Sequence, residues 1–596
     1  MIREISNFIE IVPRTYITES IKEGLYFIIT LNSTGNYERH TTYLIKDKKN
    51  LSDEIPDIIL EYSYRSSLVS MHKAIDGGKK KIHSSNPLSI IFKLENINIV
   101  DKSIEPYYKN LEKINNYSDE EKIIVSYVRK YVENDLFKLI QDQVKEKMDN
   151  KGYKGYIFTY FDYPMEYYIK FHDNYLANKL FNKTDYNEQN NEYGLSDFFN
   201  GSNSNKQFLL HQTSFFEANS IISKEIAKNL FDFESLLKNN KLPKQLPIFI
   251  DKNELNKKVI NLYGYERVFS FKEIIRTLFE SHRSDLSNYY LFNWDNKDGL
   301  IINDLDYVER FIYKIDGVKI KNVLDMKVKD NIVDDITIDN IFELEYKVFR
   351  KLFNNCLIVA GKDKTFYRYF GSFTNLKQNI PKGRNKVNIL AYRKNIYDYI
   401  YKSKKESING KIFYKIVISS ILDDIHYNNN IFVIGEKLNI LFSLNNIFDI
   451  NNNNFGGLNM STIIPEMLEK IRSIINSESG GLHLEDDNEF AFASGQLIYF
   501  LLSRSESTNK TLSLLEPFIT KTDFQQYKMV ITNAIRYYKH AISFNNTRFE
   551  KLASEVLGYE TSSSNITTLL PIILAGCFST SLMYEKKSLK QGGKNE

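Results

Sequence analysis

One stretch near the C-terminal end constrains the fold of this chain more than any other. It runs from residue 490 to 504 and reads FAFASGQLIYFLLSR. Phe490, Ala493 and Leu497 recur at helical spacing, so one face of the helix is expected to be buried. The small residues around Gly495 would let a second helix approach closely. The stretch is therefore predicted to be the central helix of a helical bundle.

The length of the chain predicts several domains. At 596 residues it exceeds what one hydrophobic core usually supports. We predict an α+β, multi-domain protein whose mixed N-terminal region is followed by an all-α C-terminal bundle. The predicted parts are an N-terminal α+β domain over 1–183, a mixed middle region over 184–450, an Asn-rich linker with two adjacent glycines over 451–459, and the bundle over 460–596.

Several local patterns are specific enough to test. Residues 24–31 and 41–45 read as two strands joined by turn residues, which predicts a hairpin. Residues 118–148 are predicted to form one helix, opened by a capping box at Ser118. From about 215 to 350, helical patterns dominate.

The composition restricts the classes of partner and site. A formal net charge of +4 is nearly neutral for this length, so nucleic acid could be bound only through local basic patches. The two cysteines, Cys356 and Cys577, can form neither a disulfide framework nor a four-thiolate zinc site. We expect both to be buried, in a cytoplasmic protein without metal or cofactor. The longest apolar run, 569–578, is about half of the ~20 residues that a membrane span needs, so no membrane partner is expected.

The sequence motifs that identify common classes of enzyme are absent or incomplete in this chain. The chain has no complete P-loop and no nucleophile elbow. His172-Asp173 lacks a companion metal-ligand cluster, and no second acid with a lysine soon follows Pro56-Asp57. We therefore predict that the protein is not an enzyme. A metal-dependent nuclease with an unrecognised site stays open as an alternative.

The first candidate for nucleic-acid binding is a basic loop at 71–86. Its two adjacent glycines would let the backbone approach a phosphate while lysines surround it. The alternative explanation of the same residues is a basic turn that is exposed to solvent and binds nothing. The candidate contact residues are Lys73, Lys79, Lys80, Lys81, His83 and Asn86.

A second and a third candidate lie further along the chain. The segment 362–405 holds twelve Lys or Arg against two acids, with aromatic residues interleaved as in surfaces that stack bases, although some of these aromatics must be core. The third is the outer side of a helix near residue 530, where a charged solvent-facing surface is the alternative explanation. The candidate residues are Lys382, Arg384, Lys386 and Arg393 in the second, and Lys528, Arg536 and Lys539 in the third.

Taken together, these stretches resemble the large subunit of type I-B CRISPR interference complexes (Cascade). At the N-terminal end the resemblance rests on Arg65-Ser66-Ser67, Lys73-Ala74-Ile75-Asp76 and the run from Lys80 to Pro87. At the C-terminal end it rests on 490–502, Leu515-Glu516-Pro517-Phe518, Arg548-Phe549 and Leu574-Ala575-Gly576. The C-terminal run is the more specific. The resemblance also implies cysteine pairs of a zinc ribbon near the polar stretch at 184–206, and this chain has no cysteine there.

The resemblance implies a non-catalytic subunit of an RNA-guided complex in antiviral defence. Its N-terminal part would contact the 5′ end of a guide RNA and inspect the short duplex motif beside the target, while base pairing reads the target itself. The bundle would help hold the displaced DNA strand and contact a recruited nuclease-helicase. Other expected partners are the target double-stranded DNA and the backbone subunits of the complex. An RNA-binding scaffold outside CRISPR is a further alternative.

The resemblance also implies that the bundle is made separately as a small subunit. Gly456-Gly457 can be encoded by purine-rich codons that resemble a ribosome-binding site, and Met460 follows at a workable distance. We therefore predict internal initiation at Met460. The alternative is that the two glycines only loosen a linker.

Overall fold

The computed structural model describes most of the chain. The described residues are 1–13, 22–45, 56–147, 155–183, 193–196, 222–264, 269–282, 286–329, 331–362, 364–374, 376, 378–448, 459–477, 481–505, 511–543, 546–561 and 565–585. The predicted linker lies outside them except for Asn459, and so does most of the polar stretch at 184–206.

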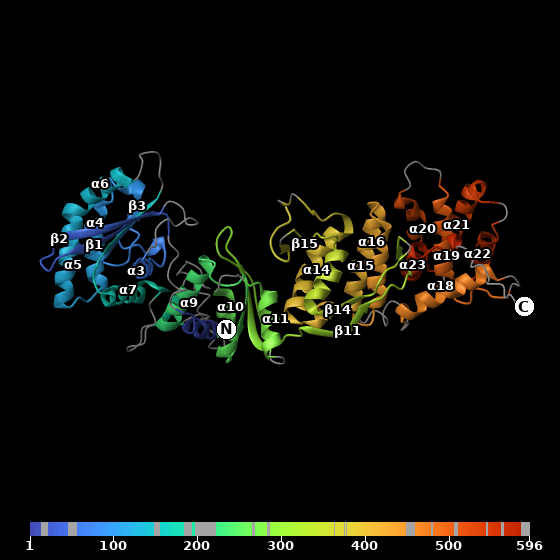
Figure 1. Ribbon diagram of the computed structural model, residues 1–596, viewed down its shortest axis with the longest axis horizontal. Helices are drawn as coiled ribbons and strands as arrows, with labels where there is room; N and C mark the ends of the chain where they lie inside the picture. The colour runs from blue at the N-terminus through green and yellow to red at the C-terminus, as the bar shows by residue number, and fades with distance from the viewer. Residues whose placement is uncertain are drawn as a thin grey trace, which may run out of the picture. The chain divides into compact units, whose positions relative to one another are not determined.

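The chain divides into two compact units. The first comprises Met1–Leu278 and Asn288–Tyr307, and the second comprises Phe279–Ser287 and Val308–Glu596. Both contain helices and small sheets (Figure 1), which confirms the predicted α+β, multi-domain fold class. The bounds of the units differ from the predicted domain boundaries, and those boundaries stay a prediction.

The first unit is built on a four-stranded sheet with the order β2-β1-β4-β3. β1 pairs antiparallel with β2 and parallel with β4, and β4 pairs antiparallel with β3. The strands are β1 (Gly24–Leu31), β2 (Tyr37–Ile45), β3 (Ser89–Lys93) and β4 (Tyr156–Phe161).

The predicted hairpin at the N-terminal end is confirmed, with its second strand starting at Tyr37. Its turn is fixed by the Asn32 side chain, whose Oδ1 accepts hydrogen bonds from the backbone N–H of Thr34 at 3.0 Å and of Asn36 at 2.9 Å. Gly35 adopts a φ of +79°, a conformation that glycine reaches without steric cost.

Helices cover both faces of this sheet. Tyr62 stacks on Tyr160 at a centroid distance of 5.5 Å on one face, and Tyr131 meets Phe161 at 6.0 Å on the other. The helices are α3 (Asp57–Tyr64), α4 (Ile104–Ile114), α5 (Asp119–Tyr131), α6 (Phe137–Lys147) and α7 (Met165–Lys179). The first helix, α1 (Ile2–Glu10), packs against α9 (Lys224–Lys238) and β8 (Gln245–Phe249) instead. The predicted helix over 118–148 is confirmed as α5 and α6, joined by a π-helical turn at Val132–Leu136 and opened by the expected capping box of Ser118 and Glu121.

The rest of the first unit, and the segments that connect it to the second, mix short strands with helices. They are β5 (Phe181–Lys183), β6 (Tyr193–Ser196), β7 (Ile222–Ser223), α9 (Lys224–Lys238), β8 (Gln245–Phe249), α10 (Asn253–Gly264), α11 (Phe271–His282), β9 (Ser287–Asp295) and β10 (Ile301–Arg310). Short 3₁₀ turns lie at Met71–Lys73, Leu94–Asn96 and Asp101–Ser103.

The second unit starts with strands and continues with long helices. Its strands are β11 (Lys314–Ile320), β12 (Lys327–Val328), β13 (Asn331–Ile332), β14 (Ile336–Asn340), β15 (Ile358–Ala360) and β16 (Thr365–Tyr367). Its helices are α12 (Ile341–Leu344), a π turn (Glu345–Phe349), α13 (Arg350–Leu352), α14 (Gly383–Lys402), α15 (Gly410–His426), α16 (Ile431–Ser443), α18 (Met460–Asn476), α19 (Asp487–Ser503), α20 (Glu516–Ile519), α21 (Phe524–Tyr538), α22 (Thr547–Gly558) and α23 (Leu570–Phe578). Further 3₁₀ turns are Lys405–Ser407, Leu512–Leu515, Lys539–Ala541, Thr567–Leu569 and Leu582–Tyr584.

The predicted central helix is confirmed as α19. Every residue from Glu489 to Ile498 is buried. Its partner is α23, and the two backbones meet at glycines: a Cβ on Gly495 would lie 2.2 Å from the carbonyl oxygen of Ile573, and a Cβ on Gly576 would lie 2.1 Å from that of Phe492. Only glycine fits at either position.

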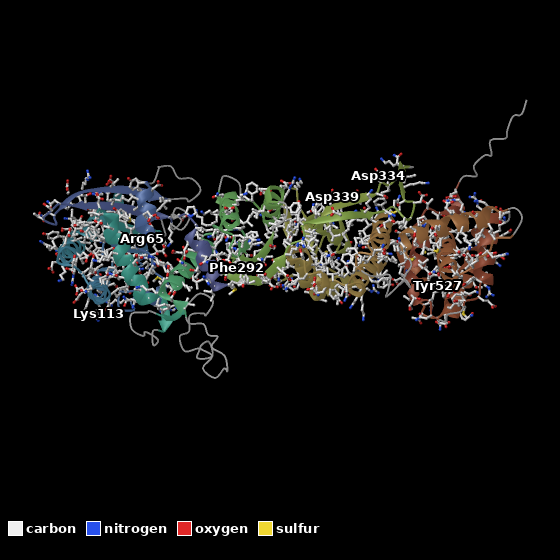
Figure 2. All side chains as sticks on the ribbon, turned by 90° about the horizontal axis from the view of Figure 1, so that it is seen from below. Arg65, Lys113, Phe292, Asp334, Asp339 and Tyr527 are labelled. Atoms are coloured by element: carbon white, nitrogen blue, oxygen red, sulfur yellow. The ribbon has the colours of Figure 1, made fainter. Side chains whose placement is uncertain are left out.

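Polar side chains inside the bundle are paired. The buried Gln496 amide donates to the carbonyl oxygen of Gly576 at 2.8 Å and accepts from the N–H of Leu582 at 3.0 Å. The hydroxyls of Ser494 and Tyr527 lie 2.7 Å apart, and burial raises the pKa of Tyr527. Tyr527 is labelled on the bundle in Figure 2. These pairs satisfy groups that would otherwise be costly to bury.

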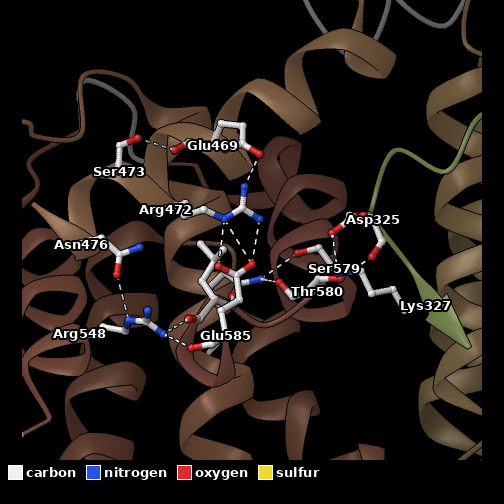
Figure 3. Close-up of polar contacts among 12 residues, drawn as sticks. Asp325, Lys327, Glu469, Arg472, Ser473, Asn476, Arg548, Ser579, Thr580 and Glu585 are labelled. Atoms are coloured by element: carbon white, nitrogen blue, oxygen red, sulfur yellow. Dashed lines mark hydrogen bonds and ion pairs between the residues drawn. The ribbon is translucent and has the colours of Figure 1, made fainter. Parts of the chain in front are cut away.

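Ion pairs and hydrogen bonds to backbone groups connect α18 and α22 to the segment that follows α23 (Figure 3). Arg472 of α18 lies between Glu469 and Glu585, with Nη2 2.9 Å from Oε1 of Glu585. Arg548 of α22 donates to Oδ1 of Asn476 at 3.0 Å and to the carbonyl oxygen of Leu582 at 3.2 Å. Arg548, one of the residues that carry the resemblance, therefore ties α18 and α22 to the segment after α23.

Both cysteines are buried, as predicted. Burial raises the pKa of the Cys356 thiol and raises that of Cys577 to about 12.

One segment of the described chain, Thr567–Tyr584, is long and apolar enough to cross a membrane by length and composition alone, and 56% of it is buried inside the protein. A core helix such as α23 passes the same test.

Candidate nucleic-acid interface

The basic loop of the first unit is organised around the buried carboxylate of Asp76. Its two oxygens accept hydrogen bonds from the backbone N–H groups of Lys80 at 2.8 Å, Lys81 at 2.5 Å and Ile82 at 3.1 Å. Lys80 has a φ of +53°. A single carboxylate that accepts three successive N–H groups fixes the backbone, so the loop presents its side chains in a defined arrangement.

The glycine pair of the loop leaves open space in front of the backbone. Gly77 and Gly78 are exposed and have φ values of +67° and +84°. A Cβ on Gly78 would meet nothing within 4 Å. This geometry is compatible with the predicted approach of a phosphate to the backbone, and the positive φ values explain why glycine is needed here.

The lysines of the loop carry charge that no carboxylate neutralises. Lys79 and Lys80 are exposed, and neither they nor Lys81 forms an ion pair within the described part of the chain. Their ammonium groups meet neutral acceptors instead: Lys79 contacts the carbonyl of Lys102, and Lys81 Nζ lies 3.2 Å from Oδ1 of Asn96. The three ammonium groups therefore have no carboxylate partner among the described residues, and the one carboxylate at the centre of the loop, Asp76, is bound to backbone N–H groups.

Two of the other predicted contact residues have different environments. Lys73 is half-buried and donates to the carbonyl oxygen of Phe181 at 3.0 Å. The His83 pKa is lowered by burial and by the charges of Lys93 and Lys22. His83 is therefore neutral at pH 7 and adds no positive charge to the loop.

Asn86, another predicted contact residue, lies beneath the loop and not on its surface. Its side chain is fully buried, and its Nδ2 donates at 3.0 Å to the carbonyl oxygens of both Arg65 and Tyr168. Its Oδ1 accepts from the N–H of Leu88 at 3.1 Å. With both ends of the amide used, Asn86 joins the loop to the segments at Arg65 and α7 and cannot reach a ligand.

Two of the three N-terminal motif segments on which the resemblance rests, Arg65–Ser67 and Lys80–Pro87, lie side by side. The N–H of Ser85 donates to the carbonyl oxygen of Ser66 at 2.9 Å, next to the bond between Asn86 and Arg65. Arg65 is 5% exposed, and its guanidinium lies 5.0 Å from the ring of Tyr64. Much of the motif therefore packs the interior beneath the loop.

The basic segment at 362–405 separates into structural and exposed cations. Arg368 donates to the carbonyl oxygen of Asn379 at 2.9 Å, and Arg393 donates to that of Gly371 at 2.8 Å. Lys394 and the buried Lys402 both pair with Asp398, at 2.6 and 2.7 Å. All four cations therefore have partners within the segment, two of them backbone carbonyls and two the Asp398 carboxylate. Burial lowers the pKa of Arg393.

At the start of α14, Arg384 also has a partner, the carboxylate of Asp423. Its Nη1 lies 3.2 Å from Oδ1 of Asp423, whose other oxygen accepts from the N–H of Asn385 at 2.8 Å. This carboxylate already occupies the positive end of the helix. Lys382 and Lys386 are exposed and form no ion pair with any described residue, so they are the two predicted residues of this segment that remain available.

The aromatic residues of the segment likewise include buried side chains with partners inside the protein and exposed side chains. Tyr369 is buried and donates to Oε1 of Glu345 at 2.5 Å. Phe366 and Tyr367 on β16 are 55% and 38% exposed. Of the interleaved aromatics, these two could stack on a base.

The third candidate surface lies on α21 and the turn after it. Lys528 is structural, because its Nζ donates to the carbonyl oxygen of Tyr559 at 2.9 Å. Arg536 and Lys539 are exposed, and between them Tyr537 is 71% exposed. The sequence reasoning missed Tyr537, although its position next to Arg536 and off the apolar stripe of the helix was a usable signal.

No protein-family model, curated protein or solved structure matches this chain. Within the described ranges, no three or more His, Cys, Asp or Glu residues gather in a group that could hold a metal ion.

Proposed function

We propose that this chain is the non-catalytic large subunit of an RNA-guided DNA-surveillance complex in antiviral defence. In this proposal its basic loop contacts the 5′ end of the guide RNA or the duplex beside the target. The bundle helps hold the displaced strand and helps recruit a nuclease-helicase. The proposed partners are guide RNA, target double-stranded DNA and the other subunits of the complex.

The observation that carries the proposal is that Lys79, Lys80 and Lys81 lie next to one another in the chain and form no ion pair with the described residues. Three positive charges without a carboxylate partner repel one another, and a fold that fixes them together favours an external anion. Because Asp76 holds the backbone of the loop, little conformational entropy is lost when a phosphate binds. This arrangement suits the contact with a nucleic-acid backbone that the resemblance implies.

Two further surfaces fit the same role. Lys382 and Lys386 lie in a segment that also exposes Phe366, and Arg536 and Lys539 flank the exposed Tyr537. Cations beside exposed aromatic rings suit single strands, because phosphates bind the cations and bases stack on the rings. We assign these surfaces to the displaced strand or to the guide.

The test is a DNA titration with the assembled complex at several salt concentrations. Replacing Lys79, Lys80 and Lys81 by Ala should weaken binding and flatten the log–log salt dependence by about 0.9 for each phosphate that the variant no longer binds. The matched control replaces Lys130, Lys138 and Lys145, three exposed lysines of α5 and α6, and should behave as wild type.

Unchanged affinity and slope in the loop variant would refute the assignment of the loop. The isolated chain, incubated with DNA and Mg²⁺ or Mn²⁺, tests the alternative. Cleavage by the isolated chain that depends on the metal would identify a nuclease and contradict a non-catalytic role.

A further inference from the structure

The second unit contains a cavity of about 290 Å³ that the proposed function does not use. It lies beside β11, α12, the C-terminal end of α14 and the turn that follows α14. Its volume is roughly twice that of the ~150 Å³ apolar cavity known to hold one benzene molecule. A molecule of about ten to fifteen non-hydrogen atoms would therefore fit.

The walls of the cavity are apolar. Val318, Ile341, Leu344 and Ile408 line it and are at most 7% exposed. Ile312 and Ile447 also line it and are 38% and 39% exposed, so they form part of its mouth. When an apolar ligand occupies the cavity, its own surface and the exposed surface of Ile312 and Ile447 are buried, which favours binding.

The polar groups of the cavity favour a ligand that carries negative charge. Lys314 and Lys405 line it, are exposed, and form no ion pair with any described residue. Asp316 is the single carboxylate of the lining. The hydroxyl groups of Tyr399 and Ser403 are also present, and burial raises the pKa of Tyr399, which keeps its proton available for donation.

The backbone beside the cavity is irregular. β11 and β14 pair at Lys314 with Asn340 and again at Val318 with Ile338, so the register skips Ile315, Asp316 and Gly317. Gly317 has a φ of +72°, which lets the chain bulge away from the ladder at this point. Two of the three skipped residues, Ile315 and Asp316, line the cavity. The bulge therefore shapes one side of the cavity.

We propose that this cavity binds a small organic acid with an apolar body, of the size of a medium-chain fatty acid or an aryl acid. The apolar body occupies the space between Val318, Ile341, Leu344 and Ile408. The acid group lies at the mouth, where Lys314 and Lys405 neutralise it. This inference is independent of the proposed function.

The test uses the full-length chain and the fluorescent probe 2-naphthoate, which is an apolar ring system with one carboxylate and is within the size that the cavity accepts. We expect saturable binding that octanoate displaces, while 1-octanol, of equal chain length and without charge, competes at least tenfold more weakly. Lys314→Glu combined with Lys405→Glu should weaken probe binding about tenfold, which corresponds to ~1.4 kcal/mol. Reversing Lys319 and Lys411, exposed lysines outside the lining, changes net charge equally and should have no effect.

A second variant tests the cavity without using charge. Ile312→Trp enlarges a half-exposed residue at the mouth, so it should reduce probe binding while the melting temperature stays within a few degrees of wild type. The proposal is overturned if the probe shows no saturable site, if octanol competes as well as octanoate, or if both the charge-reversed and the Trp variants bind the probe as wild type does.

Discussion

At the scale of single residues, the basic loop contains two kinds of polar side chain. Asp76 and Asn86 are buried, and each satisfies several backbone groups, whereas Lys79 and Lys80 face solvent without a carboxylate partner among the described residues. The sequence alone predicted a basic loop with adjacent glycines. It did not separate Asn86 from the lysines, because the backbone groups that Asn86 pairs with come from distant parts of the chain.

Asn86→Ala should destabilise the protein by at least about 2 kcal/mol. The substitution leaves the carbonyl groups of Arg65 and Tyr168 and the N–H of Leu88 without their present partner. Urea unfolding followed by circular dichroism measures the effect, with Lys79→Ala, expected to stay within about 0.5 kcal/mol of wild type, as the control. Equal stability of the two variants would show that the Asn86 hydrogen bonds are not needed.

His83 should make stability depend on pH below neutrality. Its pKa in the folded protein is lowered from 6.5 by burial and by Lys93 and Lys22, so between the folded pKa and 6.5 the unfolded chain binds more protons than the folded one. The His83 contribution is therefore complete above pH 6.5 and is lost as pH falls. His83→Gln should flatten the decrease of unfolding free energy as pH falls below about 6.5. Parallel curves for wild type and variant would contradict this.

At the scale of elements, the helices with a strong apolar period were the most predictable. The α5–α6 helix and α19 lie where spacing and capping residues put them, and α18 begins at Met460, where the bundle was predicted to start. The segment from about 215 to 350 was predicted less well. Its helices α9, α10, α11 and α12 are present, but β9, β10, β11 and β14 occupy much of the rest. Of these strands, β10 and β11 are partly exposed on both faces and β9 is mostly buried on both, so none of the three has the clean alternation of a half-buried strand.

The close contact between α19 and α23 depends on glycine. Gly495→Ala should lower the unfolding free energy by about 3 kcal/mol or more, because its methyl group would lie 2.2 Å from a backbone oxygen of Ile573 and the helices would have to separate. Gly558→Ala on α22 is the control: nothing lies within 4 Å of the added carbon, and helix propensity predicts a gain of up to about 1 kcal/mol. Thermal unfolding of both variants gives the comparison, and a Gly495 variant as stable as the control would refute the close packing.

At the scale of the whole molecule, the division into units differs from the predicted domains. The bundle belongs to the same compact unit as residues from 308 onward, and Thr580 donates from its N–H to the carbonyl oxygen of Leu324 at 3.1 Å. Sequence patterns locate helices, but such contacts depend on how the helices pack, which the spacing of apolar residues does not specify. Most of the predicted linker lies outside the described residues, so the boundary at 450 stays a prediction.

Internal initiation at Met460 should yield a short product that contains the bundle alone. Recoding Gly456 and Gly457 synonymously without purine runs, together with Met460→Leu, should abolish a C-terminally tagged product of 460–596 while full-length chain persists. A synonymous change of equal extent upstream of 450 is the control. Internal initiation is wrong if the unaltered gene yields no short product, or if the short product persists after both changes.

The central claim is that this chain belongs to an RNA-guided complex, and the nucleic acid that co-purifies with it tests this most directly. We predict that tagged chain, expressed with its neighbouring genes, brings down a repeating backbone subunit and short RNAs of uniform length with a common 5′ sequence. Replacing Lys79, Lys80 and Lys81 by Ala should reduce this recovery, while replacing Lys130, Lys138 and Lys145 should not. Recovery of no RNA, or of RNAs without a common 5′ end, would contradict the claim.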